Sequence, residues 1–488
     1  LNTVYERFFQ GFAVKEADTH GIVYTPQPIV SFMCASVEAV LQREFARSLS
    51  DRGVQILDPA TGTGNFIVNL LDRIAAPDLA YKYAHDLFCN EIMLLPYYIA
   101  SMNIEHKYYE RTGAYAPFDG LCFVDTLATA GQTGSQVQAS IFTERNTQRV
   151  ERELDAQIMV IIGNPPYNVG QENENDNNKN RKYRKAKKTD PDQIDDSVSN
   201  TYAASSNATN KNAYSDTYIK FFRWATDRLG DRDGIICFVS NNSFAKMYSL
   251  DGIRKHFCDD FTSIYHLDLR GNANTSGELR KREAGNVFND MIKVGIGITL
   301  LVRCKTGMNE TQNRATIHYY DIGDYVRSEA KLKFLQKHAS IDTIDWQELV
   351  PDENHTWLTE GMRPEYRTFL PIGSKTAKSA TDADAQTIFK SYGRGVATSR
   401  DDWAYDFDAE SLEMKIKRFI ETYNTEVDRW HRRGNDPRSM DDFVLYDDQR
   451  IKWSRDLKLD VQRRNYAEFS PTKVRRSLYR PFIKEWVF

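Results

Sequence analysis

The sequence predicts an α/β protein built on a mixed sheet, and three observations lead to that class. Between Val54 and Cys304, short β-branched runs alternate with longer amphipathic stretches, which is the pattern of strands joined by helices. A glycine-rich turn follows the first strand, at a position where such sheets bind ligands. Three successive strands also end at an acidic residue, Asp58, Glu91 and Asp125 in turn.

The individual elements follow from the period of the apolar residues and from the turn residues that bound them. We expect strands at Val54–Leu57, near Asn90 and Glu91, and at Leu121–Val124, Ile158–Ile162, Ile235–Val239, Ser263–Leu269 and Val294–Arg303. We expect helices at Val4–Phe12, Gln27–Phe45, Asn65–Ile74, Tyr214–Leu229 and Leu412–Trp430. A further helix should follow the strand near Glu91 and run to about Glu105.

Composition limits the class of protein. Of the 488 residues, 41% are hydrophobic and 27% are charged, so the chain can bury a sizeable core and is not disordered as a whole. The longest apolar stretches reach about nine residues, whereas a membrane span needs roughly 20. The six cysteines form no close pair, which is typical of reduced thiols. We therefore expect a cytoplasmic protein that does not interact with a membrane.

The chain divides into three expected regions. Residues 1–50 form an N-terminal helical segment with a Tyr-Thr-Pro turn, residues 51–325 form the sheet domain, and residues 326–488 form a mostly helical or α+β extension. Within the sheet domain, residues 168–213 are a polar insert with too few large aliphatics to build a core. The chain starts at Leu1 without a methionine and ends just after an aromatic, basic run, so we expect a fragment of a longer polypeptide.

The turn from Asp58 to Gly64 predicts a small-molecule site. Its glycines let a ligand approach the backbone, but the third glycine of a dinucleotide fingerprint and the lysine of a phosphate loop are both missing. An aspartate at its start would repel a phosphate and suits a cationic amine, which indicates S-adenosylmethionine. Glu91 is then suited to the ribose hydroxyls and Asp125 to the adenine amino group.

The sequence Asn164-Pro165-Pro166-Tyr167 after the fourth strand is the most specific motif. Two prolines stiffen the backbone, so the Asn164 side-chain oxygen and the Pro165 carbonyl form two acceptors at a fixed separation. They fit one planar amino group, and accepting both of its hydrogens aims the nitrogen lone pair at an electrophile. Tyr167 offers a ring on which a base can stack. An ordinary proline-rich turn is the less favoured interpretation.

In this order, the two motifs resemble those of class I S-adenosylmethionine-dependent methyltransferases that act on amino nitrogens. Further segments are similar to single-polypeptide type I (type ISP) restriction–modification enzymes. These segments are Val23–Pro26, Asn168–Asn178, Asn200–Ala203, Tyr218–Trp224, Leu269–Asn272, Ser276–Glu278 and Tyr479–Phe482. The resemblance implies a Rossmann-like, seven-stranded mixed sheet and N6-adenine methylation of double-stranded DNA. It also implies a nuclease and helicase upstream, and a target-recognition domain that is truncated or missing downstream.

The resemblance also assigns roles to residues. Cofactor contacts are expected from Tyr24, Thr25 and Pro26, from the turn at Asp58, Ala60, Gly62, Gly64 and Phe66, and from Glu91, Asp125 and Asn164. Catalysis is expected from Asn164, Pro165, Pro166 and Tyr167. Phe288 matches the aromatic that stacks on the second face of the target base. The chemistry requires no metal, and no His/Cys cluster suggests one.

DNA contacts are expected from two basic segments, although the net charge of the chain is −4. One segment lies in the polar insert, and the other, Gln449 to Lys484, has eleven bases against three acids. The specific candidates are Lys179, Lys182, Arg463, Arg464, Lys473, Arg475 and Arg476. For the first segment, a solvated charge run is an equally good interpretation.

Two alternatives remain open at this point. The same Asn-Pro-Pro-Tyr motif can serve a methyltransferase that acts on a protein glutamine or on RNA. The chain could also be a DNA-specificity module that keeps the fold without catalysis. The polar insert and the basic C-terminal end disfavour the first alternative, and the intact Asn164 and Tyr167 disfavour the second.

Overall fold

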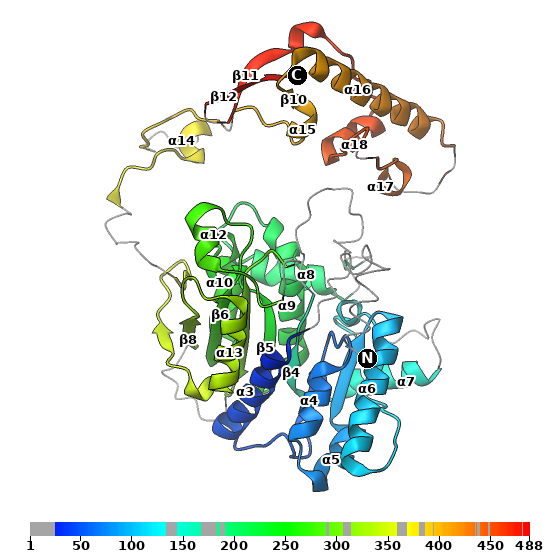
Figure 1. Cartoon of the computed structure of the whole chain (residues 1–488), viewed down its shortest axis with the longest axis vertical. Coiled ribbons are helices and arrows are strands. Elements are labelled where there is room, and N and C mark those ends of the chain that lie inside the picture. The colour runs from blue at the N-terminus through cyan, green and yellow to red at the C-terminus, as the bar shows by residue number, and fades with distance from the viewer. Residues whose placement is uncertain are drawn as a thin grey trace. The chain divides into compact units, whose positions relative to one another are not determined.

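The structure is a computed structural model, and its described residues form two compact units (Figure 1). Among the described residues, the first unit ends at Leu358 and the second begins at Thr368. The described residues are 25–132, 144–166, 183–185, 191–288, 292–305, 314–358, 368–379, 386–393, 395–434, 436, 440–447, 449–480 and 482–488. The expected helix at Val4–Phe12 lies outside them.

The first unit contains a nine-stranded mixed sheet with the order β3-β2-β1-β4-β5-β7-β6-β8-β9. Strands β1 to β5 are parallel, and β7 is antiparallel to both of its neighbours, β5 and β6. The strands are β1 Gln55–Asp58, β2 Leu87–Glu91, β3 Leu121–Phe123, β4 Ile158–Gly163, β5 Gly234–Asn241, β6 Ser263–Arg270, β7 Ile296–Arg303, β8 Thr316–Asp321 and β9 Gln347–Leu349. The predicted α/β fold with a mixed sheet is confirmed.

The expectation of seven strands needs a correction, because two more strands extend the sheet. β8 pairs in parallel with β6, from Ser263 opposite Thr316 to Asp268 opposite Asp321, and β9 pairs with β8. The added strands satisfy backbone groups of β6 that would otherwise form an open sheet edge. The first unit therefore continues past residue 325, where the sequence suggested a boundary.

Helices cover both faces of the sheet. α3 Gln27–Phe45 packs beside α4 Asn65–Arg73 and α13 Ser328–His338 on one face, and α4 also contacts α6 Leu94–Thr112 (Figure 1). α9 Thr217–Leu229 contacts β4 and β5 on the other face. Because both faces are covered, all eight residues of β5 are buried, as is typical of central strands.

The remaining elements of the first unit are short or lie at its periphery. The helices are α5 Ala76–His85, α7 Glu144–Asp155, α8 Ile194–Val198, α10 Ser243–Lys246, α11 Asp251–Asp260 and α12 Gly277–Glu283. A π-helical turn, η3 Ser199–Ala203, follows α8, and 3₁₀ turns are η1 Thr126–Thr129, η4 Asn212–Ser215, η5 Tyr248–Leu250 and η6 Ile341–Thr343. In the described part of the chain, no helix combines the length and the apolar character needed to cross a membrane.

The second unit has its own core, as expected for an α+β extension. α16 Ala409–His431 buries Phe419, Tyr423 and Val427 in that core. A small antiparallel sheet has the order β10-β12-β11, so β11 is an edge strand. The elements are α14 Lys375–Ser379, α15 Asp401–Ala404, β10 Tyr405–Asp406, α17 Met440–Phe443, α18 Arg455–Gln462, η8 Pro471–Lys473, β11 Arg475–Arg480 and β12 Ile483–Val487.

Candidate cofactor and substrate site

The pairing of β1 with β4 brings the two sequence motifs together. Leu57 lies opposite Ile161, so the turn that starts at Asp58 and the residues after Gly163 leave the sheet side by side. The strand order reverses between these two strands, and open α/β sheets bind ligands at such a switch point. A Cβ at Gly163 would lie 2.7 Å from Asp58 Oδ1, which shows how closely the two loops approach.

Asp58 holds the turn together and does not face an open surface. Its side chain is fully buried, Oδ1 accepts from the Ala60 N–H at 3.1 Å, and Oδ2 accepts from the Thr61 hydroxyl at 3.0 Å. Burial raises the pKa of Asp58 to about 7. These two hydrogen bonds shape the turn, and the expected contact of Asp58 with the cofactor stays a prediction.

The two glycines of the turn have different surroundings. Both have positive φ, +55° at Gly62 and +85° at Gly64. A Cβ on Gly62 would meet no atom within 4 Å, whereas one on Gly64 would lie 3.1 Å from Ile104 Cγ1 and 3.3 Å from Ala100 Cα. Gly62 therefore borders open space that a ligand can enter, and Gly64 lets α4 pack against α6.

Glu91 links the loops after β1 and β2. Its Oε2 accepts from the Gly62 N–H and its Oε1 from the Met93 N–H, both at 2.8 Å. The residue is only 8% exposed, and burial raises the pKa of Glu91 to about 7 despite these hydrogen bonds. A carboxylate has about four acceptor positions, so two backbone bonds leave room for a ligand hydroxyl.

Asp125 has a partner that the sequence did not suggest. Its Oδ1 accepts from the Leu127 N–H at 3.2 Å, and its Oδ2 accepts from the Tyr183 hydroxyl at 2.9 Å. Tyr183 is anchored in turn, because its N–H donates to Asp195 Oδ2 at 2.8 Å and the Lys220 ammonium lies 5.5 Å from its ring centre. The signal in the sequence is that Tyr183 is the only aromatic residue between 168 and 201.

Asn164 follows β4 with its amide in a defined orientation. Its Nδ2 donates to the Thr25 hydroxyl at 3.0 Å, and the Thr25 carbonyl accepts from Asn65 Nδ2 at 3.1 Å. Asn164 Oδ1 is buried and has no hydrogen-bond partner among the described residues. A buried acceptor without a donor costs about 1–3 kcal/mol, so this atom is a candidate contact for a ligand N–H.

Other predicted site residues lie away from an open surface or outside the described residues. Phe66, on α4, is 3% exposed and belongs to the core, and its predicted contact with the cofactor stays a prediction. Phe288 is 5% exposed, with its N–H bonded to Asn286 Oδ1 at 3.0 Å. Its predicted role in stacking on a base stays a prediction. Tyr24, Tyr167, Lys179 and Lys182 lie outside the described residues.

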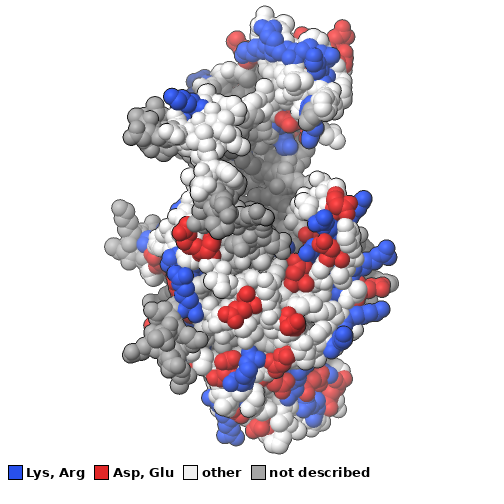
Figure 2. Space-filling model, turned by 90° about the vertical axis from the view of Figure 1, so that its left-hand side faces the viewer, with Lys and Arg blue, Asp and Glu red and all other residues white. Residues whose placement is uncertain are grey.

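The basic candidates of the C-terminal segment lie on the second unit. The side chains at 463, 464, 473, 475 and 476 are all exposed. Arg475 and Arg476 belong to the edge strand β11, and the Arg476 guanidinium lies 5.2 Å from the Trp486 ring centre. Figure 2 shows Lys and Arg gathered in a row on this unit, whereas acids and bases alternate on the visible face of the first unit.

The contrast between the two glycines predicts different consequences for stability. Gly64→Ala should lower the free energy of unfolding by at least about 1 kcal/mol, because the added methyl meets α6 in addition to the unfavourable φ. In Gly62→Ala the added methyl meets no atom, so only the unfavourable φ lowers the free energy of unfolding, and the loss should be smaller. Denaturant unfolding of the two variants measures the difference. Equal losses would contradict the packing role of Gly64.

The comparisons with known proteins agree with this geometry. The family model of the N-6 DNA methylases matches residues 1–200, and that of the type ISP C-terminal specificity domain matches residues 387–488. The second match begins inside the region 326–488, so specificity-domain sequence is present from residue 387. Among curated proteins, no match was found.

Three solved structures are similar over nearly the whole chain. The DrdV–DNA complex is 38% identical over 99% of this chain and 45% of that one, with a TM-score of 0.87. A nuclease-deletion mutant of the type ISP enzyme LlaGI, in complex with a DNA substrate mimic, is 34% identical. The match covers 100% of this chain and 38% of that one, with a TM-score of 0.86. The ATP-dependent type ISP enzyme LlaBIII bound to DNA is 32% identical. The match covers 99% of this chain and 31% of that one, with a TM-score of 0.85.

The chain thus spans less than half the length of each of these three proteins. The methylase match covers the glycine turn and Asn164, and the specificity match covers the basic end of the second unit. Taken with the order of the strands and the position of both motifs at the switch point, these matches show that the chain belongs to the N-6 DNA methylases of the type ISP restriction–modification family.

Proposed function

We propose that this chain is the methyltransferase and adjoining specificity region of a restriction–modification enzyme. It transfers the methyl group of S-adenosyl-L-methionine to N6 of an adenine in double-stranded DNA. The observation that carries this proposal is the buried, unpartnered Oδ1 of Asn164, beside the glycine turn. An amide oxygen without a donor suits an incoming amino group, which is the reacting group of adenine.

The residues around the switch point fit the proposed cofactor. The open side of Gly62 admits its methionine part, Glu91 accepts from the ribose hydroxyls, and Asp125 accepts from the adenine amino group. Thr25 contributes by orienting Asn164, and Pro26 lies at the start of α3. When bound, the cofactor supplies an electrophilic methyl group on a sulfonium centre.

The chain then positions the nucleophile. An adenine inside a duplex cannot reach the site, so it leaves the base stack at a cost of a few kcal/mol. Asn164 Oδ1 and the Pro165 carbonyl accept the two hydrogens of its amino group, which directs the nitrogen lone pair toward the methyl group. Tyr167 stacks on the base, and Pro166 stiffens the turn. Once the new N–C bond forms, the excess proton leaves to water.

The proposed partners are double-stranded DNA and the rest of the same polypeptide, including a nuclease and a helicase. We propose that the exposed bases of the second unit, Arg463, Arg464, Lys473, Arg475 and Arg476, contact phosphates. The enzyme would act on DNA in the cytoplasm. Methylation of a protein glutamine or of RNA is not favoured, because the chain carries a type ISP specificity domain at 387–488.

Asn164→Ala should reduce methyl transfer at least about a hundredfold, because removal of one positioned catalytic contact costs about 3 kcal/mol. Cofactor affinity should change little. Incorporation of labelled methyl into duplex DNA measures the methyl transfer, and calorimetry measures the cofactor affinity. Asn207→Ala is the matched control, since Asn207 is an exposed asparagine outside the site. Normal turnover of the Asn164 variant would refute its role.

Cofactor affinity should rise between about pH 6 and pH 8. Burial raises the pKa of Asp58 and of Glu91 to about 7 each, so both acids are mostly neutral below that pH and charged above it. The charged acids attract the cationic cofactor. Calorimetric titrations across this range measure the rise, and Glu91→Gln should weaken it. Affinity that is constant or falls with pH would contradict the assignment of these carboxylates.

Tyr183→Phe should lower cofactor affinity about tenfold, because Asp125 loses a donor that orients its carboxylate. The loss should vanish with a cofactor analogue whose purine carries an oxygen in place of the amino group. Tyr248→Phe, at a tyrosine that is 66% exposed, serves as the control. Tighter binding by the Tyr183 variant would mean that its hydroxyl competes with the adenine.

A further inference from the structure

A cationic pocket lies at the carboxyl end of β6, apart from the site described above. Its volume is about 390 Å³, and its lining includes Gly271, Asn274, Arg280, Asn286 and Lys293. That volume falls within the range of about 300–1,000 Å³ that is usual for ligand sites. Among the described residues, the lining has two cations and no carboxylate.

Two described acids near the pocket, Glu283 and Glu278, are engaged by other groups. Glu283 Oε2 accepts from the N–H groups of Gly271 at 2.7 Å and Asn272 at 2.8 Å. Glu278 Oε1 accepts from the Tyr325 hydroxyl at 2.5 Å, and its other oxygen lies 3.5 Å from the Lys281 ammonium. Neither of these two carboxylates is among the described residues that line the pocket.

Arg280 gives the pocket its specificity for an anion. It lies on α12, its side chain is half-buried, and its Nη1 is buried without a hydrogen-bond partner among the described residues. Buried donors are nearly always paired, so the missing acceptor indicates a ligand oxygen. A guanidinium pairs with the oxygens of a phosphate by two parallel N–H bonds, a geometry that an ammonium does not offer.

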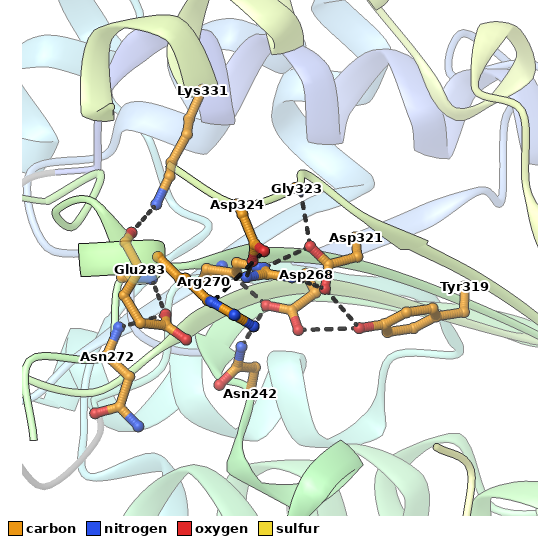
Figure 3. A network of polar contacts seen from close by, with 12 residues as sticks. Asn242, Asp268, Arg270, Asn272, Glu283, Tyr319, Asp321, Gly323, Asp324 and Lys331 are labelled. Atoms are coloured by element: carbon orange, nitrogen blue, oxygen red, sulfur yellow. Dashed lines mark hydrogen bonds and ion pairs between the residues drawn. The ribbon is translucent and has the colours of Figure 1, made fainter. Parts of the chain in front are cut away.

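The frame of the pocket is rigid. Arg270, in a left-handed conformation with φ +55°, donates to Asp321 at 2.6 and 2.8 Å and also pairs with Asp324 (Figure 3). The buried Lys331 ammonium donates to the carbonyls of Glu283 at 3.0 Å and Gly285 at 2.7 Å. These contacts hold the loop after β6 and the end of α12, so the cavity exists before any ligand arrives.

The pocket lies at the same edge of the sheet as Asn164. The carboxyl end of β6 is three strand positions from β4, since the order is β4-β5-β7-β6. At a spacing of about 4.8 Å per strand, the separation is roughly 14 Å. One DNA strand advances about 3.4 Å per nucleotide, so a strand with an adenine at Asn164 has phosphates within about four nucleotides of the pocket.

We propose that this pocket binds a phosphodiester of the DNA strand that carries the target adenine. Arg280 donates charge-assisted hydrogen bonds to the phosphate oxygens, and Lys293 adds a second positive charge. This inference rests on the proposed function, because it requires a DNA strand at Asn164. The contact would fix the register of the extruded nucleotide without reading its base.

Arg280→Gln in the whole chain tests the proposal, with Lys281→Gln as the matched control. Lys281 is the next residue of the same helix, its side chain is 72% exposed, and it does not line the pocket. Binding to a duplex is followed by fluorescence anisotropy over a series of salt concentrations. Arg280→Gln should weaken binding about tenfold and reduce the salt slope by about 0.9, the value for one phosphate. Lys281→Gln should change neither quantity beyond a general charge effect.

Two further measurements keep the outcomes separate. Lys293→Gln should also lower the salt slope, and it replaces the arginine variant if that variant does not fold. Cofactor affinity by calorimetry should be unchanged in every variant. If Arg280→Gln and Lys293→Gln match the control while the parent chain binds duplex DNA, the phosphate site is refuted and the proposed function stands. If the parent chain neither binds nor methylates duplex DNA, the proposed function fails first.

Discussion

The parallel pairing of β1 with β4 is the constraint on which the site depends. It brings the turn at Asp58 and the amide of Asn164 to one edge of the sheet, although more than a hundred residues separate them in the chain. Gly163 makes this approach possible, because any Cβ there would come within 2.7 Å of Asp58 Oδ1. A slip of one residue in the register would turn Asn164 toward the opposite face of the sheet.

The acids of the site bind backbone as well as a prospective ligand. Asp58 holds its own turn, Glu91 joins the loops after β1 and β2, and Asp125 begins the 3₁₀ turn η1 and accepts from Tyr183. Each carboxylate is thus preorganised by donors from the chain, which reduces the ordering that a ligand would otherwise have to impose. Truncation of these acids consequently disturbs the loops as well as the binding of a ligand.

Strand β8 has a comparable positioning role beside β6. Strand β8 adds to β6 and supplies Asp321, which accepts from Arg270, so the loop after β6 has a defined shape. That loop and α12 surround the cationic pocket. The proposed catalytic and phosphate-binding elements are therefore positioned by one continuous hydrogen-bonded sheet, and their separation follows from the number of strands between them.

The sequence by itself determined the α/β class and seven of the nine strands of the large sheet, but not β8 and β9. The spacing of apolar residues and the positions of the prolines are local properties of the sequence. Asn164 and Glu91 could therefore be located at strand ends without coordinates. Only the tertiary structure decided that Phe66 faces the core, that Gly64 serves packing, and that Tyr183 reaches Asp125 across 58 residues. Such contacts depend on how distant elements pack together, which no local pattern encodes.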